Sequence, residues 1–174
     1  MSVPDFVLEL RRHVGTTPLW LTGTTAVIRD SGSTHVLLVR RADNGWWTPV
    51  TGIVDPGEHP ADAAVRESRE EADVDIRVDR LASVGVTRMV TYANGDRAQY
   101  LDHTFACTYL GGEPHPADGE NTDVRWFPVD DLPELRPHMR ARIEAGLADE
   151  ERTRLPTATE SAGAVDAQPA APAD

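Results

Sequence analysis

The sequence contains no lysine, a single cysteine and no long apolar run. All 17 basic residues are arginine, which excludes P-loop and Schiff-base mechanisms because both depend on a lysine amine. The lone Cys107 excludes an internal disulfide framework and a cysteine cage around a metal. The N-terminus lacks the apolar core of a signal peptide, and no segment is long enough to span a bilayer. We therefore expect a cytoplasmic protein with no membrane partner.

Positive charge is also scarce in this chain. There are 29 acidic residues, and the formal net charge is −12 at pH 7. Proteins bind nucleic acids through a positive surface that neutralises phosphates, so this charge argues against a nucleic-acid partner. It does not argue against a small phosphorylated ligand, because bound metal ions can reverse the local charge of an acidic site.

The hydrophobic pattern predicts one main domain in which helices cover a sheet. The 174 residues are enough to bury a core. Helices are expected at 4–14, 60–72 and 133–147. Strands are expected at 22–28, 36–40, 46–49, 52–54, 74–78, 81–88, 99–110 and 123–128. Asn94-Gly95 predicts a type I′ hairpin turn. This order predicts an α+β fold, an α/β/α sandwich with a mixed central β-sheet.

The chain divides into three segments. Residues 1–19 are an N-terminal helix and its lead-in, and residues 20–148 form the main domain. Residues 149–174 are rich in alanine, proline, threonine and acids and contain no aromatic residue. Such a composition cannot bury enough apolar surface to offset its ordering entropy, so we expect a disordered acidic tail.

The helix predicted at 60–72 gathers three glutamates on one face. Glu67, Glu70 and Glu71 follow the i, i+3, i+4 spacing that places side chains on a single stripe. Pro60 suits the first position of a helix. A second stripe of small side chains would let the helix lie close to a sheet: Ala61, Ala64, Val65, Ser68 and Ala72.

Two interpretations of the acidic stripe are open from the helix pattern alone. Like charges at this spacing repel one another, and Arg66 and Arg69 would balance them on a solvated face. Alternatively, divalent cations neutralise the cluster. Ligands that are all oxygen suit Mg²⁺ or Mn²⁺, which keep several waters and bridge to substrate phosphates.

The flanking residues favour the metal interpretation, because residues 52–74 resemble the Nudix box of the MutT-type Nudix hydrolases. The matching positions are Gly52, Glu58, Arg66, Glu67, Glu70, Glu71 and Val74. Ser68 stands where the box has an aliphatic residue, and Asp73 stands where it has a glycine. Neither departure removes a charged group. The lead-in at 47–52 and the closing strand at 124–127 are also similar, so the resemblance covers residues 20–147.

The resemblance implies an enzyme and a role for each acidic residue. It implies a Nudix fold and a Mg²⁺-dependent (or Mn²⁺-dependent) pyrophosphohydrolase that cleaves a nucleoside diphosphate linked to another moiety. Glu67 and Glu71 are implied to bind the metal, Glu70 to be a further ligand or to orient a metal-bound water, and the carbonyl of Gly52 to face the metal. The candidates for the catalytic carboxylate are Glu67, Glu70 and Glu120.

Other positions are implied to support the site. Glu58 and Arg66 are expected to form an acid–arginine pair that braces the loop against the helix. Asp118 and Asp123 are rivals of Glu120 for the extra carboxylate, and a solvated loop acid is an equal alternative.

The substrate is open between a nucleoside triphosphate, an ADP-ribose-like molecule and a related diphosphate. Trp46 and Tyr92 are candidates to stack on a base, and Arg97 to bind a phosphate or ribose. A core tryptophan and a solvated arginine are the plain alternatives.

Two other classes of function must be weighed against an enzyme. One is a non-catalytic sensor that binds a nucleotide or nucleotide-sugar, and the other is an interaction domain whose N-terminal helix is the interface. All box glutamates are present, which favours the enzyme. The resemblance also implies a homodimer.

Overall fold

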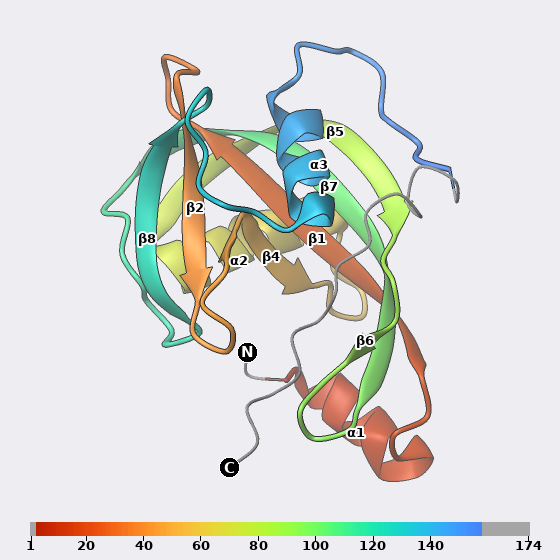
Figure 1. Ribbon diagram of the computed structural model, residues 1–174. Helices are drawn as coiled ribbons and strands as arrows, with labels where there is room; N and C mark the ends of the chain where they lie inside the picture. The colour runs from red at the N-terminus through yellow and green to blue at the C-terminus, as the bar shows by residue number, and fades with distance from the viewer. Residues whose placement is uncertain (1–2, 158–174) are drawn as a thin grey trace.

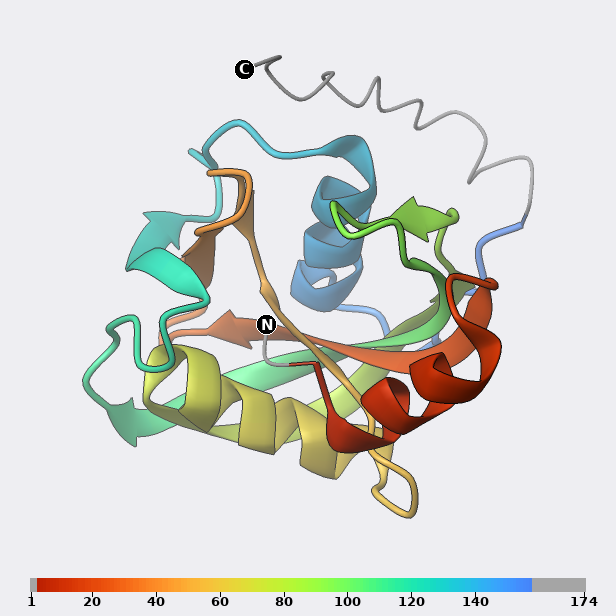
Figure 2. The same cartoon turned by 90° about the horizontal axis from the view of Figure 1, so that it is seen from below.

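The structure is a computed structural model that describes residues 3–157. A mixed eight-stranded sheet lies between α2 and α3 (Figures 1 and 2), which confirms the predicted α+β sandwich. The elements in chain order are α1 (Asp5–Val14), β1 (Leu19–Arg29), β2 (His35–Arg41), β3 (Trp47–Thr48), β4 (Val50–Ile53), α2 (Pro60–Ala72), β5 (Val74–Val86), β6 (Val90–Thr91), β7 (Arg97–Gly112), β8 (Asn121–Pro128) and α3 (Pro137–Leu147).

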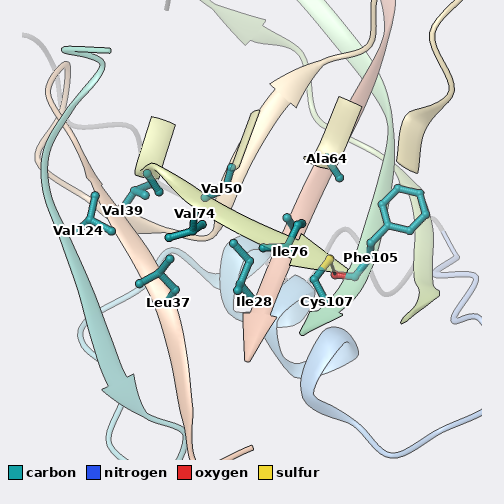
Figure 3. Close-up of a cluster of buried hydrophobic side chains, with 12 residues drawn as sticks. Ile28, Leu37, Val39, Val50, Ala64, Val74, Ile76, Phe105, Cys107 and Val124 are labelled. Carbon is teal, nitrogen blue, oxygen red and sulfur yellow. Dashed lines mark hydrogen bonds between the residues drawn. The ribbon is translucent and has the colours of Figure 1, made fainter. Parts of the chain in front are cut away.

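The central strands are apolar on both faces because each face is covered by a helix. In β1, Ala26 and Ile28 belong to the core cluster under α2, whereas Val27 belongs to the cluster under α3. β2 alternates in the same way, with Leu37 on the α2 side and Leu38 on the α3 side. Figure 3 shows the cluster on the α2 side. Side chains alternate across a strand, so a continuous apolar run serves both layers.

The strand order places the segments that carry the acidic residues beside one another. The main path of the sheet runs β3-β2-β1-β7-β5, with β1 and β7 parallel. β4 pairs with β1, which brings Gly52 opposite Thr24. β8 pairs with β2, so the residues just before β8 meet the end of β2. α2, which follows β4 directly, packs across β4, β1 and β5.

Two predicted elements differ clearly from the structure, beyond shifts of one to three residues at the ends of others. The strands expected at 74–78 and 81–88 form one strand, β5, because irregularities in its pairing with β7 accommodate the polar Asp79 and Arg80. The last helix starts at Pro137 rather than Pro133. A helix that began at Pro133 would set the Pro137 ring against the carbonyl four residues earlier.

The predicted hairpin is present, but its turn is not type I′. β6 pairs with the start of β7, and the Tyr92 N–H donates to the Asp96 carbonyl over 2.9 Å. Within this loop only Gly95 has a positive φ, of 84°. A type I′ turn needs two adjacent residues with positive φ, so a longer loop closes the hairpin.

Residues 150–156 run along the outer edge of β5. The backbone N–H of Arg154 donates to the Ala82 carbonyl over 2.8 Å, and the Val84 N–H donates to the Arg154 carbonyl over 3.1 Å. Pro156 lies over Gly85. The sequence predicts disorder from residue 149, and this stretch differs from that expectation because it pairs with a sheet edge. The rest of the predicted tail, 158–174, lies outside the described residues.

α1 packs on the far end of β1 and β7 through a small cluster of Val7, Leu21 and Ala98. Leu10 and Val14 continue the apolar stripe of α1 but are about two-fifths exposed, at 40% and 39%. Among the described residues, no helix combines the length and apolar content needed to cross a bilayer.

Candidate active site

α2 has the boundaries that its sequence predicts. Pro60 is the first helical residue, and Asp73 ends the helix in the left-handed conformation with φ 52° and ψ 44°. Aspartate tolerates this conformation better than most residues, which explains why it can replace glycine there. Ser68 is fully buried, and its hydroxyl donates to the Ala64 carbonyl over 2.7 Å. Both departures from the box are therefore accommodated locally.

The three glutamates of α2 lie at graded depth. The side chain of Glu70 is 52% exposed and that of Glu67 is 15% exposed, whereas Glu71 is 1% exposed. Glu67 lies directly against the backbone of Gly52 on β4, in space that any side chain at Gly52 would fill. The acidic stripe is therefore largely buried, which excludes a fully solvated acidic face.

Arg66 holds the loop before α2 and two of the glutamates together. Its Nε and Nη2 donate to the two carboxylate oxygens of Glu58 over 2.9 and 3.0 Å, and Nη2 also donates to the Ile53 carbonyl over 3.1 Å. The pair that the resemblance implies is thus present as a bidentate contact. Its Nη1 donates to Glu67 Oε1 and Glu70 Oε2, each over 2.9 Å. The guanidinium of Arg66 therefore neutralises part of the charge of both carboxylates.

Glu71 is held by Asn121, a residue that the sequence does not single out. Asn121 Nδ2 donates to Glu71 Oε2 over 3.2 Å, and Asn121 is only 4% exposed. Two buried oxygens beside this contact, Glu71 Oε1 and Asn121 Oδ1, have no hydrogen-bond partner among residues 3–157. Buried polar atoms in native proteins almost always have partners, so we expect a water or an ion to complete these two contacts.

The three rivals for the extra carboxylate have different surroundings. The charge of Glu120 helps to raise the pKa of both Glu67 and Glu71, so Glu120 lies within electrostatic reach of the cluster. Asp118 instead accepts the backbone N–H of Glu120 over 2.9 Å, and Asp123 pairs with Arg125. The Glu120 carbonyl accepts the Ala42 N–H, which ties this loop to the end of β2.

Arg41, the last residue of β2, is a second residue that the sequence does not single out. Its guanidinium donates to both oxygens of Asp43 over 3.2 Å, and its charge also acts on Glu71 and Glu120. A charged residue at the end of an apolar strand carries no functional signal by itself. Only the pairing of β2 with β8 brings it to the acidic cluster.

The buried carboxylates hold their protons more tightly than free ones. Burial raises the pKa of Glu71 to about 8, and repulsion from Glu67 adds to this effect against the Asn121 N–H and Arg41. Burial likewise raises the pKa of Glu67 to about 7, against the lowering effect of Arg66. In contrast, hydrogen bonds from Arg66 lower the pKa of Glu58. Strongly shifted carboxylates in one cluster are typical of functional sites.

The donor set fits a hard divalent cation. Glu71 Oε1 and Asn121 Oδ1, which lack partners among the described residues, are a carboxylate and an amide oxygen, and Mg²⁺ and Mn²⁺ accept both as ligands. No three acidic, histidine or cysteine side chains of residues 3–157 converge on one point in this arrangement. Arg66 Nη1 donates to one oxygen of each of Glu67 and Glu70. Arg66 thus provides the countercharge that a cation would provide.

The predicted substrate residues are not gathered around the glutamates. Tyr92 shares a hydroxyl contact of 2.5 Å with Tyr100, and Arg97 Nε donates to the Thr16 carbonyl over 3.3 Å. Both lie at the β6–β7 hairpin near α1, whereas α2 lies behind β2 (Figure 1). Trp46 lies elsewhere, with the guanidinium of Arg136 5.3 Å from its ring centre.

Trp46 lines a surface depression of about 370 Å³ between the β2–β3 loop and the lead-in to α3. Its carbonyl accepts the backbone N–H of Arg41 over 3.0 Å. Trp47, which also lines the depression, packs against the core cluster under α3.

Comparison with known proteins identifies the family. The model of the NUDIX domain matches residues 20–146. An NAD-capped RNA hydrolase, NudC, from Pseudomonas syringae pv. tomato is 35% identical over 124 residues, which are 66% of this chain and 40% of that protein. A MutT-like protein from Streptomyces ambofaciens is 32% identical over 108 residues, which are 62% of this chain and 63% of that protein. The chain therefore spans less than two thirds of the length of either relative.

Solved structures agree on the fold. An ADP-ribose pyrophosphatase from Streptococcus suis has a TM-score of 0.57 at 24% identity, covering 78% of this chain and 98% of that one. A UDP-X diphosphatase has a TM-score of 0.63 at 24% identity, covering 87% of this chain and 73% of that one. The domain match, the complete set of box glutamates and their arrangement on α2 together show that this chain belongs to the Nudix hydrolase family.

Proposed function

We propose that this chain is a Mg²⁺- or Mn²⁺-dependent pyrophosphohydrolase that cleaves a nucleoside diphosphate linked to another moiety. The observation that carries the proposal is the environment of Glu71. This carboxylate is 1% exposed, lies beside two other acids and keeps one oxygen without a partner among the described residues. Burying a carboxylate without a partner is costly, so the arrangement is explained if a cation normally occupies it.

The chemistry follows from the charge of the substrate. A diphosphate linkage carries negative charge that repels an incoming hydroxide, and a bound divalent cation both neutralises this charge and lowers the pKa of a water. Glu67 and Glu71 would hold the cation, with Glu70 as a third carboxylate. Glu120 reaches the cluster from the loop before β8 and would accept a proton from the attacking water. Most of the rate enhancement would come from positioning and electrostatics.

Arg66 would keep its position when a cation binds to the glutamates. In the described arrangement it holds Glu67 and Glu70 through Nη1, while Nε and Nη2 hold Glu58. When a cation takes over the charge of these two carboxylates, the contacts with Glu58 and Ile53 would keep Arg66 in place. Arg66 would then remain a brace between the loop and α2.

The substrate class is a small nucleotide or nucleotide-sugar. The relative NudC is named an NAD-capped RNA hydrolase, and NAD itself contains a diphosphate linkage. The net charge of −12 favours a small molecule over an extended RNA strand. Trp46, which lines a surface depression, is the candidate to stack on the base.

A nucleotide sensor without catalysis is the second candidate. One observation favours it: Arg66 Nη1 forms ion pairs with both Glu67 and Glu70. A sensor would bind nucleotide in the absence of turnover. The presence of all box glutamates favours the enzyme.

The experiment is a panel of nucleoside triphosphates, dinucleotides and nucleotide-sugars incubated with the full chain and Mg²⁺. Phosphate-bearing products should appear, and their release should stop with a chelator and with Glu71→Gln. Asp62→Asn on the exposed face of the same helix is the matched control and should keep activity. Turnover that survives Glu71→Gln would refute the assigned site, and saturable nucleotide binding without turnover would favour the sensor.

A further inference from the structure

β8 contains one extra residue where it meets the end of β2. Arg40 pairs with Asp123, but the next residue, Arg41, pairs with Asn121, so Thr122 has no partner position. This is a β-bulge, in which two residues of one strand lie opposite one residue of the other. Bulges of this kind re-aim a side chain.

The bulge changes the face on which Asn121 lies. Val124 and Trp126 both pack into the core cluster under α2. Strict alternation from these residues would place Thr122 on the α2 side and Asn121 on the opposite side. The structure has the reverse, since Thr122 is exposed and Asn121 is buried against Glu71 of α2. The extra residue is therefore what brings the amide to the acidic cluster.

Asn121 leaves Glu71 with a defined orientation. Asn121 Nδ2 donates a hydrogen bond to Glu71 Oε2. Two oxygens beside this contact, Glu71 Oε1 and Asn121 Oδ1, have no hydrogen-bond partner among the described residues. Both residues are more than nine-tenths buried. An amide that fixes one carboxylate oxygen and leaves the other open to a ligand acts as an outer partner of a metal-binding carboxylate.

We propose that Asn121, placed by the β8 bulge, is a positioning residue that orients Glu71 for the divalent cation. The inference rests on the proposed function, because it assigns Asn121 a role at the same site. It does not make Asn121 a catalytic residue, since Asn121 acts through Glu71.

The test measures cation binding separately from turnover. Asn121→Ala removes the amide, and Asn121→Leu removes it while keeping a side chain of similar size. Thr122→Ala is the matched control, because Thr122 belongs to the same bulge but donates its hydroxyl to the Arg40 carbonyl. The measurements are Mn²⁺ affinity by electron paramagnetic resonance, the Mg²⁺ concentration for half-maximal hydrolysis, and Tm.

Loss of such an outer partner weakens metal affinity by about 10- to 100-fold. We expect this loss in both Asn121 variants, with the KM for nucleotide at saturating Mg²⁺ retained and Thr122→Ala close to wild type. If the wild type hydrolyses nucleotide and Asn121→Leu binds Mn²⁺ with wild-type affinity, the inference is overturned and the proposed function stands. An equal loss in Thr122→Ala would also overturn it, because the effect would then belong to the strand. The proposed function fails separately if the wild type neither binds Mn²⁺ nor hydrolyses any nucleotide.

Discussion

The Glu67 carboxylate lies in the space that a β-carbon at Gly52 would occupy. Glycine is therefore needed at this position because it leaves room for the Glu67 carboxylate against β4. Gly52 is not among the glycines with a positive φ, so the constraint is one of space alone. The first glycine of the box and the first of its three clustered glutamates are thus one structural unit.

Gly52→Ala should displace the Glu67 carboxylate. A misplacement of about 1 Å can cost about 100-fold in rate, so we expect a loss of that order in kcat/KM. Gly111→Ala is the control, because no atom lies within 4 Å of the β-carbon it would add and its φ is ordinary. Steady-state kinetics of both variants test this, and a Gly52→Ala enzyme with wild-type kcat/KM would contradict the contact.

Metal-free stability should fall as the pH rises toward 8. Burial raises the pKa of Glu71 from 4.5 to about 8, so the folded state retains a proton that the unfolded state releases. The stabilisation is complete below the pKa that Glu71 has in the unfolded chain. It is lost as the pH rises through the pKa that Glu71 has in the folded chain. Tm in the presence of a chelator should therefore drop between about pH 5 and about pH 8. Glu71→Gln should make this dependence less steep, with a remainder from Glu67, whose pKa burial also raises. An unchanged slope in that variant would assign the proton elsewhere.

The segment along β5 should stabilise the fold and shield its edge. Arg154→Pro removes the N–H that donates to the Ala82 carbonyl, and a backbone hydrogen bond contributes about 1 kcal/mol. We expect a lower Tm and, because an uncovered strand edge can pair with another chain, more self-association. Arg154→Ala keeps the backbone bond and should change Tm less. Thermal unfolding and light scattering compare the two, and identical behaviour would show that the edge contact contributes nothing.

The proposed homodimer would use the uncovered part of α1. Leu10 and Val14 continue the stripe that begins with Val7 but remain exposed. Replacing both with glutamate should convert a dimer into a monomer in sedimentation equilibrium. Leu8→Glu is the control, because Leu8 is 43% exposed on another side of the helix. A wild-type chain of monomer mass would contradict the proposal.

The parts of the site that the sequence predicts are those set by local rules. α2 could be placed because Pro60 and the left-handed Asp73 mark its ends, and its spacing puts Glu67 and Glu71 on one stripe. The depth of each glutamate could not be predicted, because it depends on how β4 lies under the helix. Glu71 becomes the most buried acid of the three only through tertiary packing.

The parts that the sequence misses depend on strand pairing. Asn121 lies just before the strand expected at 123–128, and one extra residue decides which face it occupies. Arg41 reaches the cluster only because β2 pairs with β8. The sequence around Arg154 likewise shows no strand-like alternation, because only one isolated β-bridge, to Ser83, joins the described part of this segment to β5.

The most direct test is an anomalous difference map from crystals soaked with Mn²⁺ and nucleotide at a pH above about 8, where Glu71 is ionised. We expect a peak bonded to Glu71, with Glu67 on the same ion and Arg66 still held by Glu58. Hydrolysis in the crystal with no peak at Glu71, or with the cation bound elsewhere, would contradict it.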